Sequence, residues 1–125
     1  MRTMSAKFGK KSLKLTANWQ ASVRVAEEIA DPMFMAKELY LVGMFLERGI
    51  PYTPKWEFDI NSITKLIFIG AQTTDDEVTE EAVQELVFEK GFTECQQIAS
   101  SYLALIVGPQ PEVELAGKDK GDSGK

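Results

Sequence analysis

The sequence predicts a mainly α-helical protein in which an N-terminal β-hairpin packs on a bundle of about five helices. Apolar residues alternate at period two only near the N-terminus, and further along they recur at the three- and four-residue spacing of helices. Capping residues, glycines and prolines bound each helical segment. We expect one domain over residues 1–108, followed by a disordered tail at 109–125 that is rich in proline, glycine and charge.

The hairpin is predicted from residues 11–16, where Leu13 and Leu15 alternate with polar residues and so share one face. Its first arm would be residues 3–8. Two strands alone are marginally stable, so we expect the hairpin to lie on helices. A first helix should follow over about 17–30, with Thr16 or Asn18 as its N-cap. Its predicted inner face is Trp19, Val23, Ala26 and Ile29 or Ala30.

The second predicted helix is the most distinctive segment, because apolar residues surround it almost completely. It begins at an Asp31 N-cap with Pro32 in the first helical position, and it ends at Gly49. A helix of this kind is either buried or meets a partner. At about 100° per residue, one group of side chains forms a stripe that we assign to the core: Met35, Leu39, Val42 and Leu46.

The remaining apolar surface of the second helix is the candidate protein-binding site. Methionine and aromatic side chains are typical of adaptable interaction surfaces. The alternative is that the hairpin and the extended connector over residues 50–58, with Tyr52 and Trp56, cover this surface within the monomer. The predicted protein-binding residues are Met33, Lys37, Tyr40, Leu41, Met44 and Phe45, with Lys37 as a charge at the rim.

Three further helices are predicted beyond the connector. Asp59 or Asn61 should cap the third helix, and Thr79 the fourth, which ends at Gly91. Thr93 and Gln96 have the spacing of a capping box for the fifth. The predicted buried stripes are Ile60, Ile63, Leu66, Ile67 and Gly70 in the third helix, with Phe68 and Ile69 beside the stripe but little exposed; Val83, Leu86 and Val87 in the fourth; and Ile98, Ala99, Tyr102, Leu103 and Ile106 in the fifth.

The composition offers little catalytic chemistry. The 125 residues include no histidine and one cysteine, and histidine is the usual general acid or base at neutral pH. Cys95 should lie in the first turn of the fifth helix, but the neighbouring Glu94 opposes ionisation of its thiol. We therefore expect no enzymatic activity, no catalytic residues, no cofactor and no metal site. A lone cysteine and the lack of a secretory signal are typical of a cytoplasmic protein.

Charge is distributed unevenly along the chain. Residues 1–24 carry basic side chains and no acidic ones, whereas residues 75–94 are strongly acidic. This polarity would steer head-to-tail association or a charged partner, unless the two regions are simply solvated faces. The net charge of −5 and the lack of a recognition motif argue against nucleic-acid binding. No apolar run is long enough to span a membrane, and we expect no membrane partner.

Three segments together resemble the tail assembly chaperones of long-tailed bacteriophages, including the related proteins of gene transfer agents. The segments are KSLKLTANWQASVRVAEEIADP, FDINSITKLIFIGAQ and VTEEAVQELVFEKGFTECQQIASSYLALIVGPQP, and the resemblance covers residues 11–109. It implies a small helical chaperone, not an enzyme, acting in the bacterial host cytoplasm. Such a chaperone binds the tape measure protein, keeps its long apolar helices soluble and helps recruit tail tube subunits. Some family members also exist as a longer frameshifted product.

Two other functions are compatible with the residues. One is a self-assembling structural component of a phage virion, in which the surface of the second helix joins identical copies into a homo-oligomer. The other is a small regulator that binds a host protein or nucleic acid through the acidic region; salt would weaken such binding steeply. An apolar helix contact would depend much less on salt.

Overall fold

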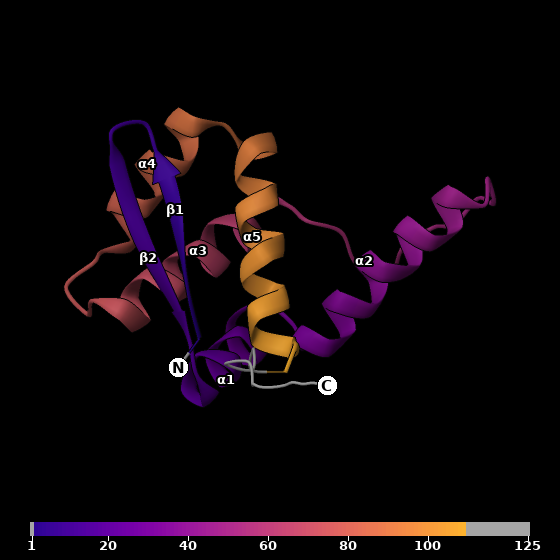
Figure 1. Ribbon diagram of the computed structural model, residues 1–125, viewed down its shortest axis with the longest axis horizontal. Helices are drawn as coiled ribbons and strands as arrows, with labels where there is room; N and C mark the ends of the chain where they lie inside the picture. Colours follow the sequence, from indigo (N-terminus) through magenta and orange to yellow (C-terminus); the bar gives the residue numbers. More distant parts are fainter. Residues whose placement is uncertain (1, 110–125) are drawn as a thin grey trace, which may run out of the picture.

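The computed structural model describes residues 2–109 and confirms the predicted fold class (Figure 1). The predicted tail beyond Pro109 lies outside the described residues. A two-stranded antiparallel hairpin precedes five helices. The elements are β1 (Arg2–Phe8), β2 (Lys11–Ala17), α1 (Trp19–Glu28), α2 (Pro32–Glu47), α3 (Ile60–Thr74), α4 (Glu80–Lys90) and α5 (Phe92–Val107).

The hairpin turns at Gly9, whose φ of 62° lies in the left-handed region that glycine adopts without strain. Its strands pair in the register Ala6 opposite Leu13. One face of the hairpin carries Leu15, which is fully buried, and packs mainly on α3 and α5. The hairpin therefore lies on helices, as two strands with one apolar face require.

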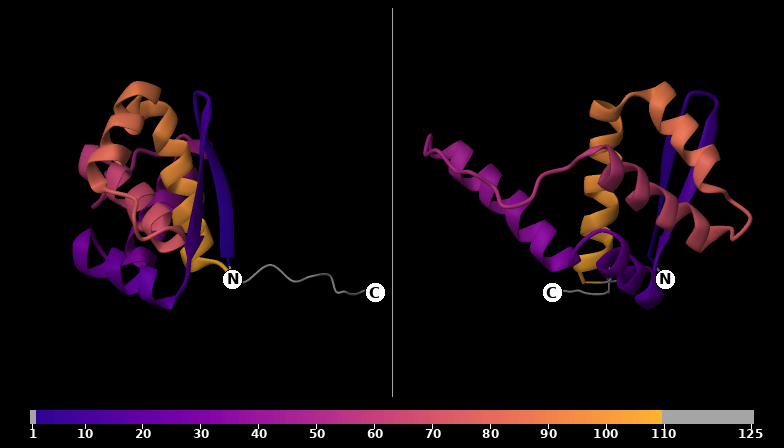
Figure 2. Two further views of the ribbon diagram at one scale, coloured as in Figure 1. Left: turned by 90° about the vertical axis from the view of Figure 1, so that its left-hand side faces the viewer. Right: turned by 180° about the vertical axis from the view of Figure 1, so that it is seen from behind.

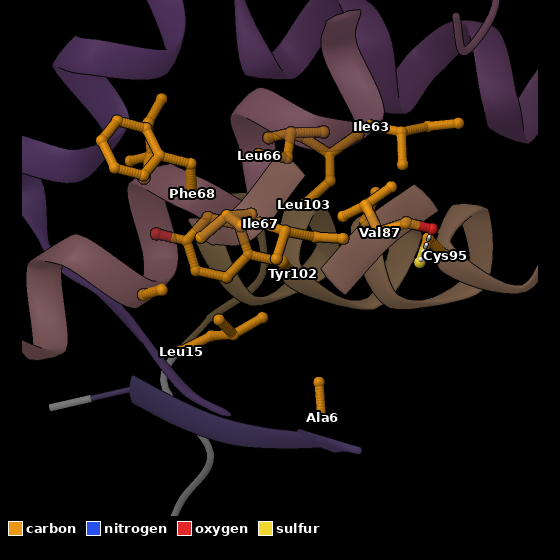
Figure 3. Close-up of a cluster of buried hydrophobic side chains, with 14 of the residues drawn as sticks. Ala6, Leu15, Ile63, Leu66, Ile67, Phe68, Val87, Cys95, Tyr102 and Leu103 are labelled. Carbon is orange, nitrogen blue, oxygen red and sulfur yellow. Dashed lines mark hydrogen bonds between the residues drawn. The ribbon is translucent and has the colours of Figure 1, made fainter. Parts of the chain in front are cut away.

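We call the hairpin with α1, α3, α4 and α5 the body. Helix α3 forms the centre of the body, and Tyr102 of α5 packs against it (Figure 3). The Tyr102 hydroxyl donates a 2.7 Å hydrogen bond to the Thr16 carbonyl oxygen of β2. Its ring passes so close to Gly70 that a Cβ atom there would lie 2.8 Å from ring atom Cε1 and 3.0 Å from Leu15 Cβ. The glycine is thus the point at which α3, α5 and β2 can approach one another.

Four helices begin at the N-caps that the sequence predicts. The side chains of Asn18, Asp31, Asp59 and Thr79 each accept a hydrogen bond from a backbone N–H in the first turn of their helix. The capping-box prediction for α5 was wrong. Gly91, with a φ of 103°, ends α4 and serves as the N-cap of α5, which begins before Thr93 can act as a cap.

The predicted inner face of α1 was right only at its C-terminal end, where Ile29 and Ala30 pack against the core, and wrong along the rest of the helix. Trp19 is 80% exposed and Val23 is at the surface, whereas Ala21 and Val25 are buried. Helix α1 packs on α3 through these smaller side chains, which permit a close approach. In α3 itself Ile60 is exposed in the first turn. The buried stripes of α4 and α5 are confirmed, with Val83, Val87, Ala99, Tyr102 and Leu103 in the core and Leu86, Ile98 and Ile106 packed against it.

Helix α2 leaves the body instead of lying along it (Figures 1 and 2). Its first turns pack on α5 and α1, and its C-terminal half projects past α5. Consequently the predicted core stripe is only half right: Met35 is fully buried and Leu39 packs on the core. Val42 and Leu46 are exposed, Leu46 by 78%, because the body ends before it reaches them.

Candidate protein-binding site

Helix α2 and the connector of residues 48–59 form a projecting unit that we call the arm. The chain turns at Gly49, which has a φ of 68°, and returns along α2 towards α3 (Figures 1 and 2). The aromatic ring of Tyr52 stacks on that of Phe45, with 5.0 Å between centroids and 18° between planes. The connector therefore covers one side of the helix with an aromatic contact.

A buried carboxylate fastens the connector to the helix. The Glu38 side chain is only 1% exposed, and its Oε1 accepts hydrogen bonds from the Tyr52 hydroxyl at 2.9 Å and the Lys55 backbone N–H at 2.8 Å. The Lys37 ammonium lies 3.8 Å from Glu38 Oε2. The Lys55 N–H contributes most to holding the pKa of Glu38 below its ordinary value, against the effect of desolvation. We call the two hydrogen bonds to Glu38 Oε1 the clasp.

The predicted binding residues divide between two sides of α2. Met33 and Tyr40 are 64% and 68% exposed, Lys37 is exposed and Met44 is half-buried. At about 100° per residue these four fall within about 60° of one another, and we call them the open side. The other two predicted residues, Leu41 and Phe45, are half-buried and turn towards the side that the connector covers.

A second exposed apolar surface, not predicted from the sequence, lies roughly opposite the open side. Val42 and Leu46, which we call the outer stripe, continue the stripe that Met35 and Leu39 bury against the body. Ile50 is exposed in the turn beyond them. The buried part of this stripe and its exposed continuation have the same helical spacing. The sequence therefore does not show where along the stripe the contact with the body ends.

A groove of about 750 Å³ lies at the foot of the arm. Met33 of the open side lines it together with Trp19 and Val23 of α1, so the apolar surface of the arm continues onto the body. Arg2 also lines the groove, and its guanidinium donates 2.9 Å hydrogen bonds to the carbonyl oxygens of Leu105 and Ile106. These bonds satisfy carbonyl groups that the end of a helix leaves unpaired.

The single thiol, that of Cys95 in α5, does not line the groove. Cys95 is fully buried between α4 and α5, and its Sγ lies 3.8 Å from the Val87 carbonyl oxygen (Figure 3). Burial raises the pKa of this thiol. Among residues 2–109 no three histidine, cysteine or acidic side chains come close enough together to hold a metal ion. Within the same residues no helix combines the length and apolar character that crossing a membrane requires.

Comparisons of the chain with protein-family models, with curated proteins and with solved structures found no match. The resemblance to tail assembly chaperones thus depends on the residues quoted above. Of the surfaces described, the arm is the one that combines large exposed apolar side chains with a projecting shape. We therefore base the functional proposal on the arm.

Proposed function

We propose that this protein is a phage tail assembly chaperone that binds an apolar helical segment of the tape measure protein through its arm and helps recruit tail tube subunits. The proposal places it in the bacterial host cytoplasm and assigns it no catalysis. Binding of the tape measure protein would occur on the open side, with Leu41 and Phe45 at its edge, and the outer stripe would offer a second contact surface on the other side of α2. The resemblance supplies the identity of the partner.

The exposure of the arm is the observation that carries the proposal. Met33, Tyr40 and Leu46 are each more than 60% exposed, although they lie on a well-formed helix. Met33 and Tyr40 lie on the open side and Leu46 on the outer stripe, and soluble monomers seldom leave apolar patches of this kind uncovered. An amphipathic helix of a partner would bury its own apolar face against the exposed apolar side chains of the arm.

The shape of the arm also favours a long helical partner. Because α2 projects from the body, a partner helix can lie along it without meeting the hairpin, which packs on the other side of α5 (Figure 1). The clasp holds the connector against α2, so the arm presents an ordered surface before binding. The groove beside Met33 would accept the end of a segment that extends past the arm.

Co-expression with a tagged tape measure fragment tests the proposal. We expect the paired substitutions Tyr40→Asp and Met44→Asp on the open side to lower co-purification at least tenfold, because each places a charge in an apolar contact. A second pair, Val42→Asp and Leu46→Asp, probes the outer stripe in the same way. Phe88→Asp is the matched control, since Phe88 is 73% exposed on α4, outside the arm.

Folding of each variant is checked by circular dichroism and thermal melting. The proposal predicts that the Phe88→Asp protein retains the tape measure fragment while the arm variants lose it. Wild-type recovery of the fragment by both folded arm variants would refute the assignment of the arm as the binding site. Failure of the wild-type protein itself to retain any tape measure segment would refute the chaperone function.

A further inference from the structure

The open side of α2 carries a second pattern that points to a specific occupant. The four residues of the open side, together with Glu47 beyond them, recur at alternating spacings of four and three, which is the seam spacing of a coiled coil. The seam residues are Met33, Lys37, Tyr40, Met44 and Glu47. The seam is symmetric about the level of Val42. Lys37 and Glu47, which have opposite charge, lie equally far from Val42 in the sequence, and so do Tyr40 and Met44.

We propose that the seam binds a second copy of this chain, with the two α2 helices antiparallel and related by a two-fold axis that crosses the seam at the level of Val42 along the helix. In this register Lys37 shares a layer with Glu47 of the second copy, and Tyr40 shares one with Met44. The symmetry repeats both layers, so the pairing has two apolar layers in the middle and an oppositely charged layer at each end. A two-fold interface uses the same patch twice and closes at the dimer.

Charge fixes the orientation. In a parallel pair each seam residue would face the same residue of the second copy, which places Lys37 against Lys37 and Glu47 against Glu47. Like charges in contact are destabilising, whereas the antiparallel pair brings opposite charges together. Among residues 2–109 the charged contacts of Lys37 are limited to Glu38, at 3.8 Å, and the Phe34 ring, at 5.5 Å from its centroid, and 59% of the Lys37 side chain is exposed.

Gly43 provides an independent reason for close packing here. A glycine in the interior of a helix is less favourable than alanine by about 1 kcal/mol. A Cβ atom at Gly43 would meet nothing within 4 Å, and its φ is not positive, so the monomer gives no reason for a glycine at this place. Gly43 borders the seam, where the absence of a side chain lets the second helix approach.

The arrangement of the arm leaves room for the second copy. The connector packs on the side of α2 that carries Phe45 and Glu38, away from the seam. In the antiparallel register the turn at Ile50 reaches the second copy near Met33, beside the groove that Trp19 and Val23 line. The two bodies then lie at opposite ends of the paired arms.

The dimer does not depend on a tape measure partner, but one consequence rests on the proposed function. If the open side binds both, the second copy and the tape measure segment compete for it. The dimer would then keep the apolar side chains covered until the partner arrives. Addition of a tape measure fragment should convert the dimer into a complex with one copy of this chain. A dimer that persists would contradict binding of the fragment on the open side and leave the dimer itself supported.

Charge reversal tests the pairing in the purified full chain. We expect Lys37→Glu and Glu47→Lys each to weaken self-association roughly tenfold, because both charged layers become repulsive. The double variant with both reversals should dimerise like the wild type. Sedimentation equilibrium over a concentration series measures this, with circular dichroism as the check on folding. A wild-type protein that stays monomeric throughout, or single variants that associate as the wild type does, would overturn the proposal.

Cysteine cross-linking tests the orientation separately. Copies carrying Tyr40→Cys, mixed with copies carrying Met44→Cys, should form disulfide-linked pairs faster than either variant alone under mild oxidation. The native Cys95 is fully buried and does not interfere. Faster linking of each variant to itself would indicate a parallel pair and overturn the antiparallel register.

Discussion

Replacing two glycines by alanine in different helices should change the stability in opposite directions. Gly70 of α3 and Gly43 of α2 both lie in helix interiors and neither has a positive φ. At Gly43 an added Cβ meets nothing within 4 Å. At Gly70 the same atom would lie 2.8 Å from the Tyr102 ring, which is fully buried and whose hydroxyl is bonded to Thr16. The ring therefore cannot move aside freely.

The magnitudes follow from these surroundings. Alanine is preferred over glycine in a helix interior by about 1 kcal/mol, so Gly43→Ala should gain up to that amount. Gly70→Ala has the same gain in helix propensity, but overpacking a rigid core costs typically 1–3 kcal/mol. Since the Tyr102 ring is fixed, we expect the upper value and a net loss of about 2 kcal/mol. For a chain of this length about 1 kcal/mol corresponds to roughly 4 °C in Tm.

Thermal unfolding by circular dichroism measures the pair. We expect Gly43→Ala to raise the Tm by up to about 4 °C and Gly70→Ala to lower it by about 8 °C. The melts should be made at low protein concentration, because self-association stabilises the folded state by mass action. A Gly70→Ala protein at least as stable as the wild type would refute the packing described around Tyr102.

Three further outcomes test the clasp and the core. The Lys55 N–H and the Tyr52 hydroxyl hold the pKa of Glu38 below 4.5, so the clasp stabilises the arm fully above pH 4.5 and is lost as the pH falls through the lower folded pKa. The Lys55 amide should therefore lose its protection from hydrogen exchange in acid. In a Glu38→Gln control, whose side chain does not titrate, protection of the Lys55 amide should not depend on Glu38 protonation. Tyr102→Phe should cost about 1–3 kcal/mol in urea unfolding, since the buried Thr16 oxygen loses its donor; an unchanged midpoint would contradict this bond. Burial raises the pKa of the Cys95 thiol, so a disulfide reagent at neutral pH should label native protein at least about 100-fold more slowly than unfolded protein, and equal rates would contradict its burial.

Local chemistry made most of the fold predictable. The N-caps Asn18, Asp31, Asp59 and Thr79 were identifiable because a cap depends on a side chain and the backbone within three residues of it. The exception is α5, where a single glycine ends one helix and begins the next. Which face of a helix is buried depends on neighbours distant in sequence, and for that reason Trp19 was misplaced in the core.

The candidate site was predictable only in part, for the same reason. Its surplus apolar residues were visible in the sequence, but the projection of α2 was not, since it depends on where α5 and α1 end in space. Hence Leu46 was assigned to the core. The clasp had no sequence signal either, because a glutamate on a helix is ordinarily solvated and nothing marks Glu38 as the acceptor for the connector.

The bonds from Arg2 to the end of α5 have a consequence for biosynthesis. They join residues 103 and 104 positions apart, and the hairpin beside them packs on α3 and α5. The body therefore cannot close on the ribosome until α5 has emerged from the exit tunnel, and the hairpin must wait for most of the chain. The clasp joins residues no more than 17 positions apart, so the arm can take shape while the body is still being translated.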